Sequence, residues 1–266
     1  MIRPQAARFS PSTDGFAFTN SWPPAPAVSI PIPSGRIGVG ISIGNAAAGL
    51  CGGMIFAALD YWHAQVSPPV SRPAPGTPLY QFIVRRLIDS WHIPVGVAEY
   101  YWWMNLPDRD SSLTIRGRPV VGQRGLSRRT IEGQWPQVRA SLDAGVPTPL
   151  GLVTVASANP GRLGRNHQAL ACGYQIAGTE VTLQVYDPNS GQDDGVHIHF
   201  DTSNPSAPTR FRHNLNIGYP VRGFFRTAYT PAMPPGTAGS ATPARSGGAV
   251  RAIPTVRPRP TAGPAG

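Results

Sequence analysis

The spacing of apolar residues changes partway along the chain of 266 residues, and this change restricts the fold more than any other feature. Apolar side chains recur at helical spacing in residues 51–64, and the patterns at 79–91 and 132–144 predict two further helices. Segments of strand length then follow, separated by glycine-rich or polar turns: 150–155, 168–174, 181–186, 196–200 and 221–229. Helices followed by antiparallel strands predict an α+β fold.

Composition divides the chain into three parts. Glycine and proline are abundant, at 30 and 31 residues, so we expect part of the chain to be unstructured. Residues 1–35 are predicted to form an extended arm that packs through Phe16, Phe18 and Trp22, and residues 36–230 to form one domain. Residues 231–266 have almost no large apolar side chain, which predicts a disordered basic tail. Within the domain, residues 38–44 are predicted to be a short strand or a turn.

The net charge of +10 comes entirely from arginine, because the chain contains no lysine. The arginines are scattered and do not alternate with aromatic residues, so we expect no specific nucleic-acid partner. The N-terminal residues lack the apolar core of a signal peptide, and no window is long enough to span a bilayer. These features predict a soluble protein, either cytoplasmic or exported without a cleaved signal. The oligomeric state is left open.

Cys51 is predicted to be the first residue of the first helix, preceded by Gly49 and followed by Gly52 and Gly53. A helix N-terminus carries partial positive charge, which favours the thiolate form of a cysteine placed there. Glycines at these positions would leave room for the backbone of a substrate. The segment is typical of a nucleophilic cysteine, although a small buried cysteine within a helix is also common.

His167 and Asp187 are predicted to lie at the ends of neighbouring strands. His167 begins an apolar segment that ends in Gly-Tyr, and its neutral ring could accept the proton of a thiol. Asp187 follows the next strand and could bind the other ring nitrogen, which would fix the tautomer. Asp187-Pro188-Asn189 is also an ordinary turn sequence, and Asn189 is the alternative orienting residue.

These segments resemble papain-like and C39-like cysteine peptidases. The order Cys51, His167, Asp187 is similar to that of these families, as are the Cys-Gly-Gly opening of a helix and the Asn-His segment that runs to Gly-Tyr. The resemblance covers roughly residues 38–230 and includes the turn at 142–151. It implies a papain-like fold with a nucleophile at a helix N-terminus, packed on an antiparallel sheet.

The resemblance also implies an activity. In those families an amide side chain six residues before the nucleophile helps form the oxyanion hole, which points to Asn45, with the Cys51 N–H as the second donor. The implied function is that of a cysteine hydrolase, a peptidase or amidase acting on a peptide or small amide without a cofactor or metal. The alternative is an inactive papain-like protein with a binding or structural role.

Two other features have competing interpretations. His197 and His199 share one strand face near several carboxylates and His213, but their spacing matches no firm zinc signature, and residues 187–194 depart from the EF-hand pattern. Cys172 could pair with Cys51, yet its odd offset from His167 predicts that it points into the core as a free thiol.

A polar, glycine-rich stretch at 105–130 follows Trp102 and Trp103. It could form a lid or a wall of the substrate site. Core aromatic residues followed by a surface loop would explain the same sequence.

Overall fold

The computed structural model describes residues 8–22, 28–31, 40–43, 49–92, 95–115 and 118–237. The helices are α1 (Pro11–Asp14), α2 (Cys51–His63), α3 (Pro78–Ser90), α4 (Val95–Met104), α5 (Leu126–Arg128) and α6 (Trp135–Asp143), with a π-helical segment at Arg129–Gln134 and a 3-10 helix at Pro160–Arg165. The strands are β1 (Val28–Pro31), β2 (Gly40–Ile43), β3 (Ser111–Ile115), β4 (Arg118–Gln123), β5 (Thr148–Val153), β6 (His167–Ala177), β7 (Glu180–Tyr186), β8 (His197–Asp201), β9 (Arg212–His213) and β10 (Gly223–Arg226).

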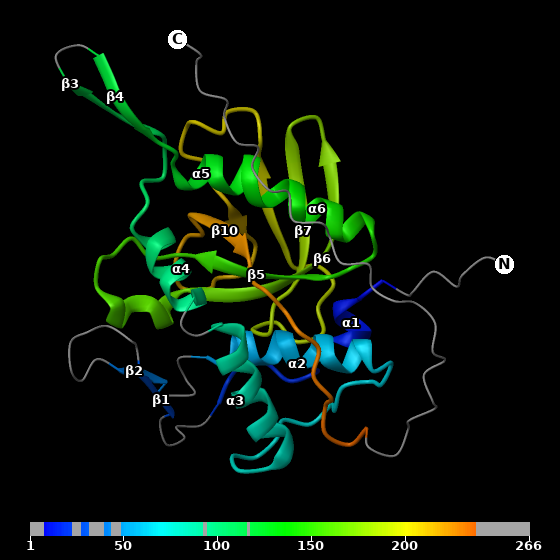
Figure 1. The fold of residues 1–266 in the computed structure, drawn as a ribbon. Coiled ribbons are helices and arrows are strands. Elements are labelled where there is room, and N and C mark those ends of the chain that lie inside the picture. Colours follow the sequence, from blue (N-terminus) through cyan, green and yellow to red (C-terminus); the bar gives the residue numbers. More distant parts are fainter. Residues whose placement is uncertain are drawn as a thin grey trace, which may run out of the picture.

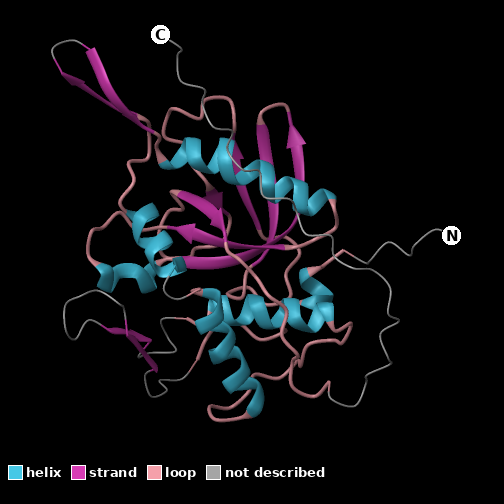
Figure 2. Cartoon of the chain, viewed as in Figure 1, coloured by secondary structure: helices cyan, strands magenta, loops and turns pink. Residues whose placement is uncertain are grey.

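A six-stranded antiparallel sheet with the order β10-β5-β6-β7-β8-β9 forms the centre of the molecule. Helices cover both faces: α2 and α3 lie on one side of the sheet, and α5 and α6 lie on the other (Figures 1 and 2). The strands β3 and β4 form a separate hairpin that projects from the body of the molecule (Figure 1). The expectation of an α+β fold is confirmed.

Each face of the sheet has its own apolar core. The core beneath α2 includes Met54, Ile55, Leu170 and Phe225. The core beneath α6 consists of Val138 and Leu142 from the helix together with alternate side chains of the strands, such as Ala169, Ala171, Leu183, Val185 and Ile198. Successive side chains of a strand point to opposite faces, so each central strand contributes to both cores.

The sequence predicted most of these elements but missed others. The predicted helices at 51–64 and 79–91 correspond to α2 and α3, and the five predicted strands correspond to β5, β6, β7, β8 and β10. The helix predicted at 132–144 begins earlier, with α5 at Leu126, and runs through the π-helical segment into α6. Helix α4 was not predicted, because its aromatic residues face the core on several sides and give little periodicity.

The N-terminal segment is integrated into the core. Phe16, Phe18 and Trp22 are buried among the side chains of the first core, as their clustering predicts. Phe9 is buried there too and packs against the ring of Trp62. Residues 8–22 therefore contribute to the same core as α2.

The start of the predicted tail is wrong by at least seven residues, because residues 231–237 pack against α2. The Ala232 N–H donates to Asp60 at 2.8 Å, and the Tyr61 hydroxyl donates to the Pro235 carbonyl at 3.0 Å. These backbone contacts offset the shortage of large apolar side chains on which the prediction relied. Residues 238–266 lie outside the described part of the chain.

Asp60, at the centre of this contact, belongs to a buried ionic cluster. Arg86 Nε lies 2.7 Å from its carboxylate, the Tyr229 hydroxyl donates to it at 2.7 Å, and Arg86 also donates to the Thr230 carbonyl at 2.8 Å. Burial raises the pKa of Asp60 above its usual value, although the hydrogen bonds from Ala232 and Tyr229 and the charge of Arg86 oppose this shift. The cluster joins α2, α3 and the C-terminal segment.

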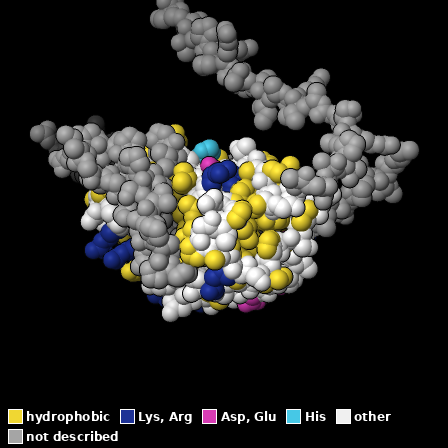
Figure 3. Space-filling view, turned by 90° about the horizontal axis from the view of Figure 1, so that it is seen from below, with side chains coloured by type: hydrophobic (Ala, Val, Ile, Leu, Met, Phe, Trp, Pro, Cys, Tyr) yellow, Lys and Arg dark blue, Asp and Glu magenta, His cyan; other side chains and the backbone are white. Residues whose placement is uncertain are grey.

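The charged side chains can be followed on one face of the molecule in Figure 3. On the face seen in Figure 3, the described arginine side chains lie in separate groups between hydrophobic and uncharged ones, and they form no continuous stripe there. Among the described residues, no helix has the length and apolar character required to cross a membrane.

Candidate active site

His167 and Asp187 meet because of the antiparallel pairing of β6 and β7. The first strand starts at His167 and the second ends at Tyr186, so the start of β6 lies beside the end of β7. His167 Nε2 lies 2.8 Å from Asp187 Oδ2, and Asp187 is fully buried, with 0% of its surface exposed. The Nδ1 atom of His167 is left for another partner.

Cys51 begins α2 and lies close to the start of β6. Gly52, the next residue, faces Gln168: a Cβ at this glycine would lie 2.7 Å from the Gln168 amide. A Cβ at Gly53 would lie 3.0 Å from the Leu87 backbone nitrogen of α3. Gly52 and Gly53 are thus explained by close packing of the helix, and the expectation that they leave room for a substrate is wrong. Cys51 keeps 9% of its surface exposed.

Cys51 contributes to the electrostatics of His167. Burial alone would lower the pKa of His167, but the charge of Asp187, the negative charge that a Cys51 thiolate would carry and the hydrogen bond to Asp187 raise it well above its usual value. Tyr100 also lies near the thiol. Burial raises the pKa of its hydroxyl well above the usual value, and the negative charge of a Cys51 thiolate adds to this shift. The structure therefore brings Cys51, His167 and Asp187 together.

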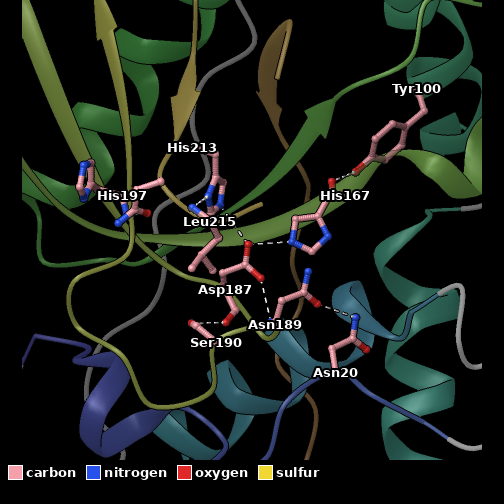
Figure 4. A network of polar contacts seen from close by, with 10 residues as sticks. Asn20, Tyr100, His167, Asp187, Asn189, Ser190, His197, His213 and Leu215 are labelled. Carbon is pink, nitrogen blue, oxygen red and sulfur yellow. Dashed lines mark hydrogen bonds and ion pairs between the residues drawn. The ribbon is translucent and has the colours of Figure 1, made fainter. Parts of the chain in front are cut away.

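Asp187 has a second imidazole partner, which Figure 4 shows on the side opposite His167. His213 Nε2 lies 3.0 Å from Asp187 Oδ2, and its Nδ1 accepts the Leu215 N–H at 3.1 Å. Because Nδ1 is an acceptor, neutral His213 carries its proton on Nε2, facing the carboxylate. Burial would raise the pKa of Asp187, but the charges and contacts of both imidazoles hold it well below its usual range.

Asn189 does not take the orienting role that the sequence left open to it. Its backbone N–H donates to Asp187 Oδ1 at 2.9 Å, and its side-chain oxygen accepts a hydrogen bond from Asn20 at 3.1 Å. Asn189 thus supports the carboxylate that contacts His167.

The described part of the chain contains one of the two predicted oxyanion donors, the Cys51 N–H. Asn45 lies in residues 44–48, outside the described part of the chain. The Cys51 N–H lies in the first turn of α2, where backbone donors have no acceptor within the helix. Among the described residues this N–H has no backbone acceptor.

Cys172 is a free thiol like Cys51, and no disulfide joins the two. It packs partly against the first core, and burial raises its pKa to about 12. The two cysteines therefore differ strongly in environment, which makes Cys172 a matched control for Cys51.

The candidate metal ligands do not converge. His199 Nε2 pairs with Glu180 at 2.9 Å, whereas His197 Nδ1 contacts the Gly195 carbonyl at 3.0 Å. Asp194 accepts hydrogen bonds from the Ser12 N–H and the Ser10 hydroxyl, so it anchors α1. Among the described residues, no group of three or more histidine, cysteine or acidic side chains is placed to hold a metal ion.

The two tryptophans before the polar stretch have different environments. Trp103 is buried in the first core, whereas Trp102 is exposed and stacks under the guanidinium of Arg129. The stretch itself contains the β3–β4 hairpin and α5.

Three residues near the site were not predicted to belong to it. His213 was noted only as a possible metal ligand. Tyr100, which donates to the His167 carbonyl at 3.4 Å, lies in the aromatic run whose structure was not predicted. Asn20 lies in the predicted arm, between aromatic residues. Each reaches the site from a distant part of the chain, so local sequence carried no signal of it.

Comparisons of this chain with models of known protein families, with curated proteins and with solved structures found no match.

Proposed function

We propose that this protein is a cysteine hydrolase that acts on an amide or another acyl group. Cys51 is the nucleophile, His167 exchanges the proton, and Asp187 orients His167. The observation that carries the proposal is the fully buried Asp187 carboxylate, 2.8 Å from Nε2 of an imidazole whose pKa also responds to Cys51, the first residue of α2. Nucleophile, base and orienting acid within reach of one another define such a site.

The raised pKa of His167 favours its imidazolium form, which stabilises a thiolate beside it. The Cys51 sulfur attacks the carbonyl carbon, the Cys51 N–H stabilises the oxyanion, and His167 gives its proton to the leaving nitrogen. Water then attacks the thioester with His167 as base, which releases the acid and restores the thiol. Asn45 remains a predicted second donor to the oxyanion.

The papain-like fold is part of the same proposal. A nucleophile at the start of a helix that packs on an antiparallel sheet, with histidine and acid on neighbouring strands, supports it. The substrate class that follows is a peptide or a small amide.

A test compares single variants of the two cysteines. With p-nitrophenyl acetate and peptide 4-nitroanilides as probes, we expect Cys51→Ala to lose turnover and Cys172→Ala to keep it. Both variants should have the circular dichroism spectrum of the wild type. Equal turnover in Cys51→Ala and wild type would refute the proposal.

An inactive protein with this fold is the alternative function. Iodoacetamide distinguishes the two, because a catalytic Cys51 reacts near neutral pH in the folded protein. A Cys51 that reacts only after unfolding would indicate the inactive alternative.

A further inference from the structure

Asn20 makes hydrogen bonds to both halves of the candidate active site. Its side-chain oxygen accepts the Leu50 N–H at 2.8 Å and the indole N–H of Trp22 at 2.9 Å. Its side-chain nitrogen donates to the Asn189 oxygen at 3.1 Å, and its backbone N–H donates to the Pro188 carbonyl at 2.8 Å. Figure 4 shows Asn20 and Asn189 below the Asp187 carboxylate.

One of these partners fixes the start of the nucleophile helix. Leu50 is the N-cap residue of α2 and immediately precedes Cys51. Its side chain is apolar and makes no capping hydrogen bond, so Asn20 supplies an acceptor at a helix end that has no side-chain cap of its own. The contact is close: Gly49 has a φ of +92°, and a Cβ there would lie 2.8 Å from the Asn20 side-chain nitrogen.

The other partners fix the turn that carries the acid. Pro188 and Asn189 directly follow Asp187, and the Asn189 N–H donates to Asp187 Oδ1 at 2.9 Å. An unbroken series of hydrogen bonds therefore leads from the N-cap of α2, through Asn20 and Asn189, to Asp187 and His167.

Buried aromatic residues hold Asn20 in place. Phe18 and Trp22 flank it, their rings pack edge to face with centroids 5.8 Å apart, and both are buried in the core next to α2. The segment that carries Asn20 is thus held by apolar packing as well as by its hydrogen bonds.

We infer that Asn20 is a positioning residue that sets the spacing between the nucleophile helix and the His167–Asp187 pair. This inference rests on the proposed function, since it assigns Asn20 a role in that same site. Asn20 acts through Leu50 and Asn189 and does not itself react.

The experiment measures alkylation of Cys51 by iodoacetamide in a Cys172→Ala background, at pH 6 and pH 9. In Asn20→Ala we expect the rate at pH 6 to fall at least tenfold relative to the parent, with little change at pH 9. The reason is that a displaced His167 no longer stabilises the thiolate at the lower pH. Thr19→Ala, which changes the neighbouring half-buried side chain and its contact with Arg72 at 3.4 Å, should react like the parent.

Two further variants separate positioning from general destabilisation. Asn20→Asp keeps the acceptors for Leu50 and Trp22 and should retain more reactivity at pH 6 than Asn20→Ala. In the double variant Asn20→Ala/Asn189→Ala, the fold-decrease of the alkylation rate at pH 6 should be smaller than the product of the decreases in the two single variants. The reason is that both substitutions break the same series of hydrogen bonds.

The outcomes distinguish this inference from the proposed function. If the parent shows no reactivity at pH 6, the proposed function fails. If the parent reacts and folded Asn20→Ala reacts equally fast at both pH values, the positioning role of Asn20 is overturned and the proposed function stands. Should Asn20→Ala not fold, Asn20→Asp and Asn189→Ala decide: parent-like rates at pH 6 in both would overturn the inference.

Discussion

Two aspartates, Asp60 and Asp187, are both buried in this protein, and their environments differ in kind. Asp60 faces a guanidinium, a tyrosine hydroxyl and a backbone N–H. Asp187 faces two imidazoles and the backbone N–H of Asn189. The pKa of Asp60 is raised, mainly by burial, whereas the pKa of Asp187 is lowered because its two imidazole partners outweigh burial.

The difference shows how a structural cluster is distinguished from a reactive one. Arginine does not lose its proton in proteins, so the positive charge of the Asp60 cluster is fixed. Imidazole gains and loses a proton near neutral pH, and a thiol lies beside one of the two imidazoles at Asp187. Only the Asp187 cluster can therefore move a proton during a reaction.

The largest effect on stability should come from Asp60→Ala. This variant removes the buried carboxylate partner of Arg86 and leaves it the exposed Asp89 carboxylate at 2.8 Å, and breaking a buried pair typically costs about 3–5 kcal/mol. Urea denaturation should show this decrease in the free energy of unfolding. Asp143→Ala, which removes an exposed carboxylate 3.7 Å from Arg139, is the control and should cost less than about 1 kcal/mol. Equal losses in the two variants would contradict the structural role of Asp60.

Asp187→Asn should have the next largest effect, on reactivity more than on stability. The amide cannot stabilise the imidazolium, so alkylation of Cys51 at pH 6 should fall by up to about 10²-fold, toward the rate of a free thiol at this pH. The loss of stability should be smaller than in Asp60→Ala, because His167 can become neutral while Arg86 cannot. Wild-type reactivity in this variant would show that Asp187 does not orient His167.

The sequence predicted one cluster better than the other. Cys51, His167 and Asp187 carry local signals: a helix start, the start of an apolar strand and the end of the next strand. Antiparallel pairing of neighbouring strands then brings the last two together. The Asp60 cluster carries no such signal, because Arg86 and Tyr229 look like ordinary surface and strand residues until α2, α3 and the C-terminal segment are packed.

The supporting residues of the site could not be predicted for the same reason. His213 reaches Asp187 from the outer strand β9, and Asn20 reaches Asn189 from the N-terminal segment. Both contacts depend on tertiary packing between distant parts of the chain. Gly52 and Gly53 are the opposite case. They were noticed in the sequence beside Cys51, but the reason for glycine at these positions is close packing against Gln168 and α3.

The pH dependence of stability should have opposite signs at the two aspartates. The lowered pKa of Asp187 contributes stability above the unfolded value of about 4, and this contribution is lost as the pH falls through the folded pKa. The raised pKa of His167 contributes stability below about pH 6.5, and this is lost as the pH rises through its folded pKa. Asp60, with a raised pKa, costs stability as the pH rises past about 4.

Urea denaturation between pH 3 and pH 9 tests these signs. The difference in unfolding free energy between wild type and Asp187→Asn should be largest between about pH 4 and pH 6.5 and should shrink on both sides. A difference that does not vary with pH would contradict the ionised pair.

The smallest effect should come from His213→Phe. The contact of His213 with Asp187 is short, at 3.0 Å, but lacks the geometry of a regular hydrogen bond. We expect a loss of about 1 kcal/mol in stability, as for a typical polar contact. Alkylation of Cys51 at pH 6 should change less than in Asp187→Asn. If His213→Phe lowered the alkylation rate at pH 6 as much as Asp187→Asn does, both imidazoles would contribute equally to the reactive cluster.

The pH dependence of Cys51 alkylation in the folded Cys172→Ala protein, with and without His167→Ala, tests the central claim most directly. A free thiol, with a pKa of about 8.5, reacts roughly two hundredfold more slowly at pH 6 than at pH 9. We predict that Cys51 loses less than tenfold over this range, and that His167→Ala restores the dependence of a free thiol. Free-thiol behaviour of Cys51 in the presence of His167, or no reaction before unfolding, would contradict the catalytic role of this site.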